Sequence, residues 1–195
     1  MDPTYDIDSH KYYVDLKPRI FDAKVFTADV DHPGGWGTIL VGGMRFGGAP
    51  IGVDTDPADA DNSCDLEFTS TYFAIDITNP EKPPELLWSF THEDLAFTTS
   101  YPTPIRMGTK WYLIFGSGPD NYDATRDPDP ASPIYGGSSQ NASIFVVDVA
   151  DGSVDQFELD GTSNPEAPNS FMADPIAVDM DIATHGDEDD PTWTG

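Results

Sequence analysis

The strongest indication of the fold is the segment Thr71-Tyr-Phe-Ala-Ile-Asp-Ile-Thr-Asn-Pro80, which returns later in the chain as Ser143-Ile-Phe-Val-Val-Asp-Val-Ala-Asp-Gly152. Phe73 and Phe145 hold the same place in the two copies and lie 72 positions apart. A repeat of this length indicates an architecture of tandem structural units, so it outweighs what any single residue suggests.

Other short segments recur in the same order around the two copies. The apolar runs Thr38–Gly43 and Tyr112–Ser117 precede them, and Leu40 and Ile114 align at a spacing of 74. Each unit also begins with a run near a proline and closes with a short aromatic run. These segments are rich in Val, Ile and aromatic residues and bounded by Gly, Pro, Asn and Asp, which is typical of β-strands. No stretch shows a sustained helical period.

Four short strands in each tandem unit favour the blade of a β-propeller over a sandwich. The sequence therefore predicts an all-β, partial β-propeller with about two and a half four-stranded, quinoprotein-like blades of a larger ring. Residues 1–195 are one fragment of that domain, with blade A at about 12–90, blade B at about 99–160 and the start of blade C at about 170–195. Gly152 is expected to take a positive φ in the turn that ends the second copy.

The composition argues against two classes of partner. Asp and Glu total 35 against 9 Lys and Arg, a net charge of −26, so the surface repels nucleic acid and anionic membranes. Cys64 is the single cysteine and cannot form an internal disulfide, which leaves a loop thiol or a bridge to another part of the protein. No apolar run is long enough to span a bilayer. The amino terminus lacks the features of a signal peptide, so if the intact protein is exported, its signal is expected upstream of Met1.

Five segments carry a resemblance to a known family: Asp8–Asp15, His32–Gly48, Tyr72–Pro80 together with Leu87–Phe90, Trp111–Gly118, and Ala173–Asp181. In order and spacing they resemble the carboxy-terminal β-propeller of the PilY/PilC family of type IV pilus biogenesis and tip-adhesin proteins. The resemblance runs from about residue 8 to residue 181.

This resemblance implies a secreted, non-catalytic protein of the cell surface, pilus tip or outer membrane. It implies roles in pilus biogenesis, surface adhesion and surface sensing, with pilus (minor pilin) proteins and a host or abiotic surface as partners. It implies neither nucleic-acid binding nor membrane insertion. Members of the family bind Ca²⁺ in an acidic loop of the propeller, and calcium occupancy is linked to pilus extension and retraction.

The acidic loop Asp179–Asp187 is the candidate calcium site. Its carboxylates Asp179, Asp181 and Asp187 fall at positions 1, 3 and 9, a spacing that lets oxygen ligands converge on a hard cation. The family's pattern has an oxygen ligand at position 5, where this chain has Ala183; Asp189 or Asp190 would substitute in a longer loop. A solvated acidic loop between strands is the alternative.

Two further acidic segments are predicted to be insertions between the second and third strands of their blades. Asp54–Asp65 is dense in carboxylates but interrupted by Pro57, and Pro119–Gln140 reads as a long polar loop. Metal binding is the alternative for both segments. Because both occupy the same slot, both are expected at one face of the ring, which is the predicted partner surface.

An enzyme is the competing class. The chain has no paired metal-binding histidines, nucleophile elbow or P-loop, and its four histidines fall in separate loops. Ala74–Asn79 followed by Trp88 also resembles the repeat of pyrroloquinoline quinone dehydrogenases, so a quinoprotein-like fragment stays an alternative, as does a generic secreted propeller that binds protein or glycan. The repeated aromatic residues are expected in the core between blades: Trp36, Trp88, Trp111, Phe73, Phe115 and Phe145.

Overall fold

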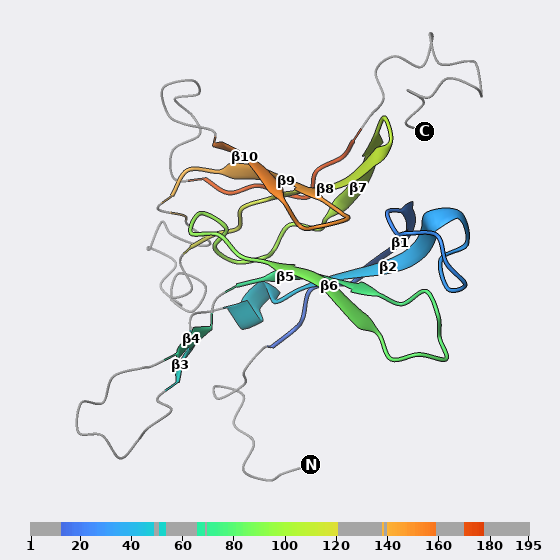
Figure 1. The fold of residues 1–195 in the computed structure, drawn as a ribbon. Helices are drawn as coiled ribbons and strands as arrows, with labels where there is room; N and C mark the ends of the chain where they lie inside the picture. The colour runs from blue at the N-terminus through green and yellow to red at the C-terminus, as the bar shows by residue number, and fades with distance from the viewer. Residues whose placement is uncertain are drawn as a thin grey trace, which may run out of the picture.

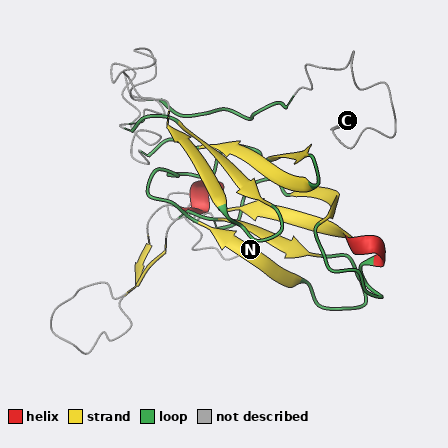
Figure 2. Cartoon of the chain, turned by 45° about the horizontal axis from the view of Figure 1, so that its top comes forward, coloured by secondary structure: helices red, strands yellow, loops and turns green. Residues whose placement is uncertain are grey.

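The computed structural model describes residues 13–48, 51–53, 66–68, 70–120, 138, 140–158 and 170–177. These residues form strands, turns and loops, and their only helical pieces are two short 3₁₀ turns, Pro33–Gly35 and Arg45–Gly48. The prediction of an all-β fold is therefore confirmed in the part of the chain that the structure describes (Figure 1, Figure 2).

Each repeat unit forms one antiparallel sheet of four strands. The first sheet has the spatial order β1-β2-β5-β6 and consists of β1 (Arg19–Lys24), β2 (Trp36–Gly43), β5 (Tyr72–Asp76) and β6 (Glu85–Phe90). The second sheet has the order β7-β8-β9-β10 and consists of β7 (Thr103–Met107), β8 (Lys110–Gly116), β9 (Ser143–Asp148) and β10 (Val154–Glu158). The prediction of four strands in each of the first two units is confirmed.

A separate ribbon interrupts the first unit. β3 (Ile51–Val53) and β4 (Leu66–Phe68) pair with each other and follow β2 in the chain, before β5 begins. The acidic segment 54–65 lies between β3 and β4, and residues 119–140 lie between β8 and β9. Both segments thus fall between the second and third strands of a sheet, as predicted.

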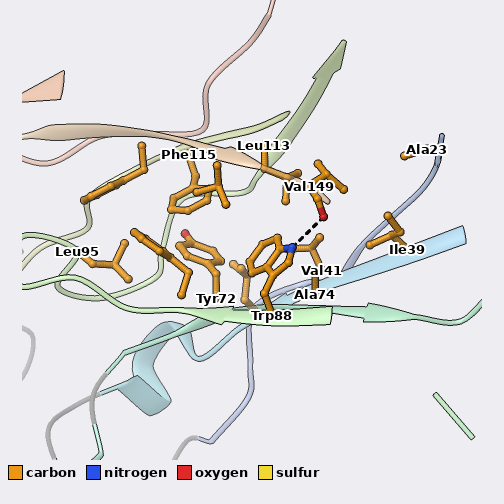
Figure 3. Close-up of a cluster of buried hydrophobic side chains, with 14 residues drawn as sticks. Ala23, Ile39, Val41, Tyr72, Ala74, Trp88, Leu95, Leu113, Phe115 and Val149 are labelled. Carbon is orange, nitrogen blue, oxygen red and sulfur yellow. Dashed lines mark hydrogen bonds between the residues drawn. The ribbon is translucent and has the colours of Figure 1, made fainter. Parts of the chain in front are cut away.

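The two sheets pack face to face around an aromatic and aliphatic core (Figure 3). Tyr72 and Phe115 come from different sheets, and their ring centroids lie 4.2 Å apart. The indole N–H of Trp88 donates to the backbone carbonyl of Val149 across the interface at 2.9 Å. These contacts hold the sheets together through close packing and a satisfied polar group, since a buried indole N–H without a partner is costly.

The sheets stack in the same sense, as neighbouring propeller blades do. Side chains alternate between the faces of a strand, and the fully buried Tyr72 and Ala74 face the second sheet, so Phe73 points to the opposite face. Its counterpart Phe145 is fully buried and meets Phe90 of the first sheet at 5.4 Å. Equivalent faces of the two sheets therefore point the same way, consistent with a partial propeller, and the closed ring remains a prediction.

The register corrects the alignment of the apolar runs. Phe73 pairs with Gly42, and Phe145 pairs with Phe115, so the second strands repeat at a spacing of 73. The alignment of Leu40 with Ile114 at 74 is wrong by one residue. A slip of one residue exchanges the two faces of a strand, so only the structural register shows which residues are equivalent.

Three of the six predicted core aromatics lie in the core between the sheets. Trp88, Phe115 and Phe145 are buried there, and Trp111 packs against its margin. Trp36 is 44% exposed, so the prediction of a buried residue is wrong for it. Phe73 is half-buried on the other face of the first sheet, because strand alternation gives the inward place to Tyr72 and Ala74.

Residues 170–177 form no strand, and they run along the second sheet. The backbone N–H of Met172 donates to the carbonyl of Ser117 at 2.9 Å, and the hydroxyl of Thr103 donates to the carbonyl of Pro175 at 2.7 Å. Residues 178–195 lie outside the described residues, so the third blade and the blade boundaries stay predictions.

Candidate functional site

The repeated aspartates Asp76 and Asp148 end equivalent strands and cap the turns that follow. One carboxylate oxygen of Asp76 accepts from the backbone N–H of Thr78 at 2.9 Å, and one of Asp148 accepts from the N–H of Ala150 at 3.0 Å. Aspartate suits this place because its short side chain satisfies the backbone N–H two residues on. The aspartate that ends each copy of the repeat is thus explained by turn formation.

The second oxygen of each aspartate binds a basic side chain from the preceding hairpin. The Nε2 atom of His32 lies 2.9 Å from Asp76, and the Nζ atom of Lys110 lies 2.8 Å from Asp148. The hydrogen bond to Asp148 raises the pKa of Lys110. In both sheets a basic side chain therefore binds the aspartate that ends the third strand. The two pairs differ in their response to pH, because histidine titrates near neutral pH and lysine does not.

His32 also binds a second carboxylate. Its Nδ1 atom lies 3.0 Å from Asp29, its ring stacks on Phe26 at 4.0 Å, and its side chain is 14% exposed. Burial opposes protonation, but the hydrogen bonds to Asp76 and Asp29 outweigh it and raise the pKa of His32. Burial likewise opposes ionisation of Asp76, while hydrogen bonds from Thr78 and His32 bring its pKa below the ordinary value.

This cluster borders a small cleft of about 170 Å³ with Asp31 and Lys82 on its rim. Its side chains are paired with one another, since Lys82 and Asn79 both donate to Asp31. The arrangement joins the loop between β1 and β2 to the turn between β5 and β6. The sequence alone does not link His32 to these carboxylates. The one signal for the link is the repeated aspartate, which in each unit follows a hairpin that carries a basic residue.

The predicted calcium ligands Asp179, Asp181 and Asp187 lie outside the described residues, as does the acidic segment 54–65. The same holds for residues 121–137 of the second insertion. In the part of the chain that the structure does describe, no group of three or more His, Cys, Asp or Glu side chains is placed to hold a metal ion.

Both insertions leave the sheets at the same end of the molecule (Figure 1). A cavity of about 560 Å³ opens at this end, with Ser70 and His92 from the first unit and Phe97, Pro119 and Gln140 from the segments around the second. The side-chain amide of Gln140 donates to the carbonyl of Asp94 at 3.0 Å and ties the two units together there. The sequence predicts a partner surface at this end, which we call the insertion end.

No protein-family model matches the chain, and no solved structure does. The type IV pilus biogenesis factor PilY1 of Pseudomonas aeruginosa strain UCBPP-PA14 is 25% identical over 155 residues, which cover 77% of this chain and 10% of that protein. PilY1 of strain PAO1 is 24% identical over an alignment of 198 residues, covering 97% of this chain and 13% of PilY1. A PilY1 homolog of Xylella fastidiosa strain Temecula1 is 27% identical over 152 residues, which cover 74% of this chain and 7% of that protein.

The chain therefore spans between 7% and 13% of the length of these curated relatives. None of the described residues belongs to a helix long and apolar enough to cross a bilayer. The similarity extends over most of this chain and agrees with the family that the five segments resemble. Over most of its length the chain is similar to a short portion of these type IV pilus biogenesis factors.

Proposed function

We propose that this chain is a non-catalytic propeller segment of a type IV pilus-associated protein and that it acts in pilus biogenesis by binding partners. The observation that carries the proposal is its similarity to PilY1 over 74–97% of the chain. The two blade-like sheets support it, because such sheets present loops at their ends on a rigid scaffold.

Binding is favoured over catalysis by what the polar residues do. His32, the histidine held between two carboxylates, joins two loops of the first sheet, and its partner Asp76 is occupied in capping a turn. The insertion end instead has a cavity lined by Ser70, Phe97 and Gln140 among others. Minor pilins and a host or abiotic surface are the proposed partners at this end, which would lie outside the cell at the pilus tip or the outer membrane.

A genetic experiment tests the pilus role. Residues 13–177 are removed from the full-length protein in the bacterium that encodes it, and surface pili are counted by electron microscopy alongside twitching motility. We expect few pili and lost motility, with export of the shortened protein verified by immunoblot. Normal piliation would refute the proposal. Dye reduction by the purified full-length protein with added pyrroloquinoline quinone would instead support the quinoprotein alternative.

We also propose that calcium binding by this chain controls pilus dynamics. The donor set Asp179, Asp181 and Asp187 has the carboxylate chemistry that Ca²⁺ prefers, and backbone carbonyls and water would have to complete the six to eight oxygens. We expect the Asp179→Ala, Asp181→Ala double variant to lose the heat of Ca²⁺ binding in calorimetry. An unchanged isotherm would exclude this loop, and Asp54→Ala, Asp56→Ala serves as the matched acidic control.

A further inference from the structure

A second cavity, of about 570 Å³, is lined by residues of both sheets. The connections that line it lie at the end of the sheets opposite the ends of β2 and β8 (Figure 1). We call it the turn-end cavity. Three connections enclose it: the loop after β1, the turn between β7 and β8, and the turn after β9. Its lining includes Lys24, Phe26, Trp36, Arg106, Thr109, Lys110, Trp111, Asp148 and Asp151. The volume suits a ligand of one or two sugar rings.

Basic residues gather at this cavity although the chain is strongly acidic. Lys24, Arg106 and Lys110 are three of the nine Lys and Arg residues in a chain of net charge −26. Lys110 is held by Asp148, whereas Lys24 is exposed and forms no ion pair with any described residue. The Nε–H of Arg106 donates to the carbonyl of Gly108 at 2.9 Å, which fixes the guanidinium at the cavity. Lys24 and Arg106 therefore offer positive charge to an anion.

Aromatic rings form another wall of the same cavity. Trp36 and Trp111 meet edge to face with centroids 5.9 Å apart, and Trp36 keeps 44% of its surface exposed. Phe26 is fixed from behind by the stacked ring of His32. An exposed tryptophan beside charged residues is typical of a binding site, because its apolar face contacts a ligand while the rim stays polar.

We propose that the turn-end cavity binds a uronic acid, a sugar with one carboxylate, whose ring packs on Trp36 and whose carboxylate meets Lys24 and Arg106. The apolar C–H face of a sugar ring suits an indole, and arginine binds carboxylates well. The exposed Asp151 can accept hydrogen bonds from sugar hydroxyls, and its charge together with that of the buried Asp148 would repel a polyanion. The mixed charges thus favour a hydroxyl-rich ligand with one carboxylate on each sugar ring over phosphates or an acidic peptide. The proposal is independent of the pilus role.

The test is a calorimetric titration of the full chain with digalacturonate, with its dimethyl ester as the neutral counterpart. We expect the acid to bind about tenfold more tightly than the ester, and Lys24→Ala or Trp36→Ala to weaken binding by about tenfold. Lys17→Ala removes the same charge outside the cavity and should leave the affinity unchanged. Circular dichroism verifies that each variant is folded.

Three results would overturn the proposal. The first is no heat of binding for digalacturonate with the unsubstituted chain. The second is equal affinity for acid and ester, which removes the role of Lys24 and Arg106. The third is equal weakening by Lys24→Ala and Lys17→Ala, which indicates attraction by overall charge. Tighter binding of hexaglutamate than of digalacturonate would also count against a sugar, and would identify an acidic peptide as the ligand.

Discussion

Phe73 and Phe145 hold the same place in two sheets of the same topology, yet their surroundings differ. Phe145 is fully buried against the first sheet, whereas Phe73 is half-buried on a face that no other described sheet covers. The same uncovered face carries a row of directly paired residues across its four strands: Ile20, Leu40, Ile75 and Leu86. Ile20 and Leu86, at the ends of this row, are 56% and 61% exposed.

A single repeat unit does not bury its own apolar residues. The Phe145 face is buried because another sheet stacks on it, and the Phe73 face has the same apolar character without such a neighbour. Repeat architectures depend on contacts between adjacent units for this reason.

The largest expected effect is on the free energy of unfolding of Phe145→Ala compared with Phe73→Ala. Phe145→Ala should cost about 3–5 kcal/mol, because it empties a closed site in the core. Phe73→Ala should cost less than half as much in this chain, since its site is already open on one side. Urea denaturation followed by circular dichroism measures both, and equal costs would show that the two faces are equally buried.

The equivalent glycines Gly43 and Gly116 give the next largest difference. A Cβ at Gly116 would lie 2.0 Å from the Cβ of Met172, so Gly116→Ala has to move the backbone of residues 170–177. A Cβ at Gly43 would lie 2.7 Å from a terminal methyl of Leu16, which can rotate away. We expect Gly116→Ala to cost about 1–3 kcal/mol and to speed hydrogen exchange in residues 170–177. Unchanged exchange there would contradict the packing of Met172 on β8.

A smaller effect depends on pH and separates the two aspartate links. The raised pKa of His32 means that its stabilising effect is fully present below the ordinary histidine value and lost as pH rises through the folded value. The lowered pKa of Asp76 means that its effect is lost only in acid, as pH falls through the folded value. His32→Gln should therefore lower the melting temperature more at about pH 5.5 than at about pH 8.5.

Lys110→Gln is the matched control for that experiment. Lysine stays protonated at both pH values, so this variant should lower the melting temperature by the same amount in each buffer. If Lys110→Gln also lowered the melting temperature more at about pH 5.5 than at about pH 8.5, the pH dependence would arise elsewhere in the fold.

The smallest expected effect is that of Lys82→Ala. Lys82 donates to Asp31 from an exposed position, where side-chain entropy and solvent offset most of the attraction. We expect its melting temperature to match that of the unsubstituted chain at about 0.15 M salt. A clear loss of stability would indicate that the loops around His32 and Asp31 act as one network.

Much of the fold could be predicted from the repeat. The two copies became β5 and β9, both long insertions fell in the predicted slot, and Gly152 has the expected positive φ of 73°. In the structure this glycine also lets the turn approach the indole of Trp88, since a Cβ there would lie 2.8 Å from the ring. Local turn chemistry and strand patterns determine these features, so the sequence carries them directly.

The faces of the strands and the site were harder to predict. The one-residue error at Leu40 and Ile114 shows that an apolar run alone does not fix which side faces the core. Trp36 follows Gly34 and Gly35, both at positive φ, and this turn places it at the rim of the sheet interface. The partners of His32 come from positions 3 and 44 residues away, and only the folded chain brings such distant positions together.

The position of Trp88 has an optical consequence. Its indole is 7% exposed and bonded to the opposite sheet, and indole emission moves to longer wavelength when water reaches the ring. Parting of the sheets would therefore shift this residue's fluorescence to the red even while each sheet keeps its strands. The emission of Trp36, which is already in contact with solvent, would scarcely change. Tryptophan fluorescence therefore reports separation of the two sheets.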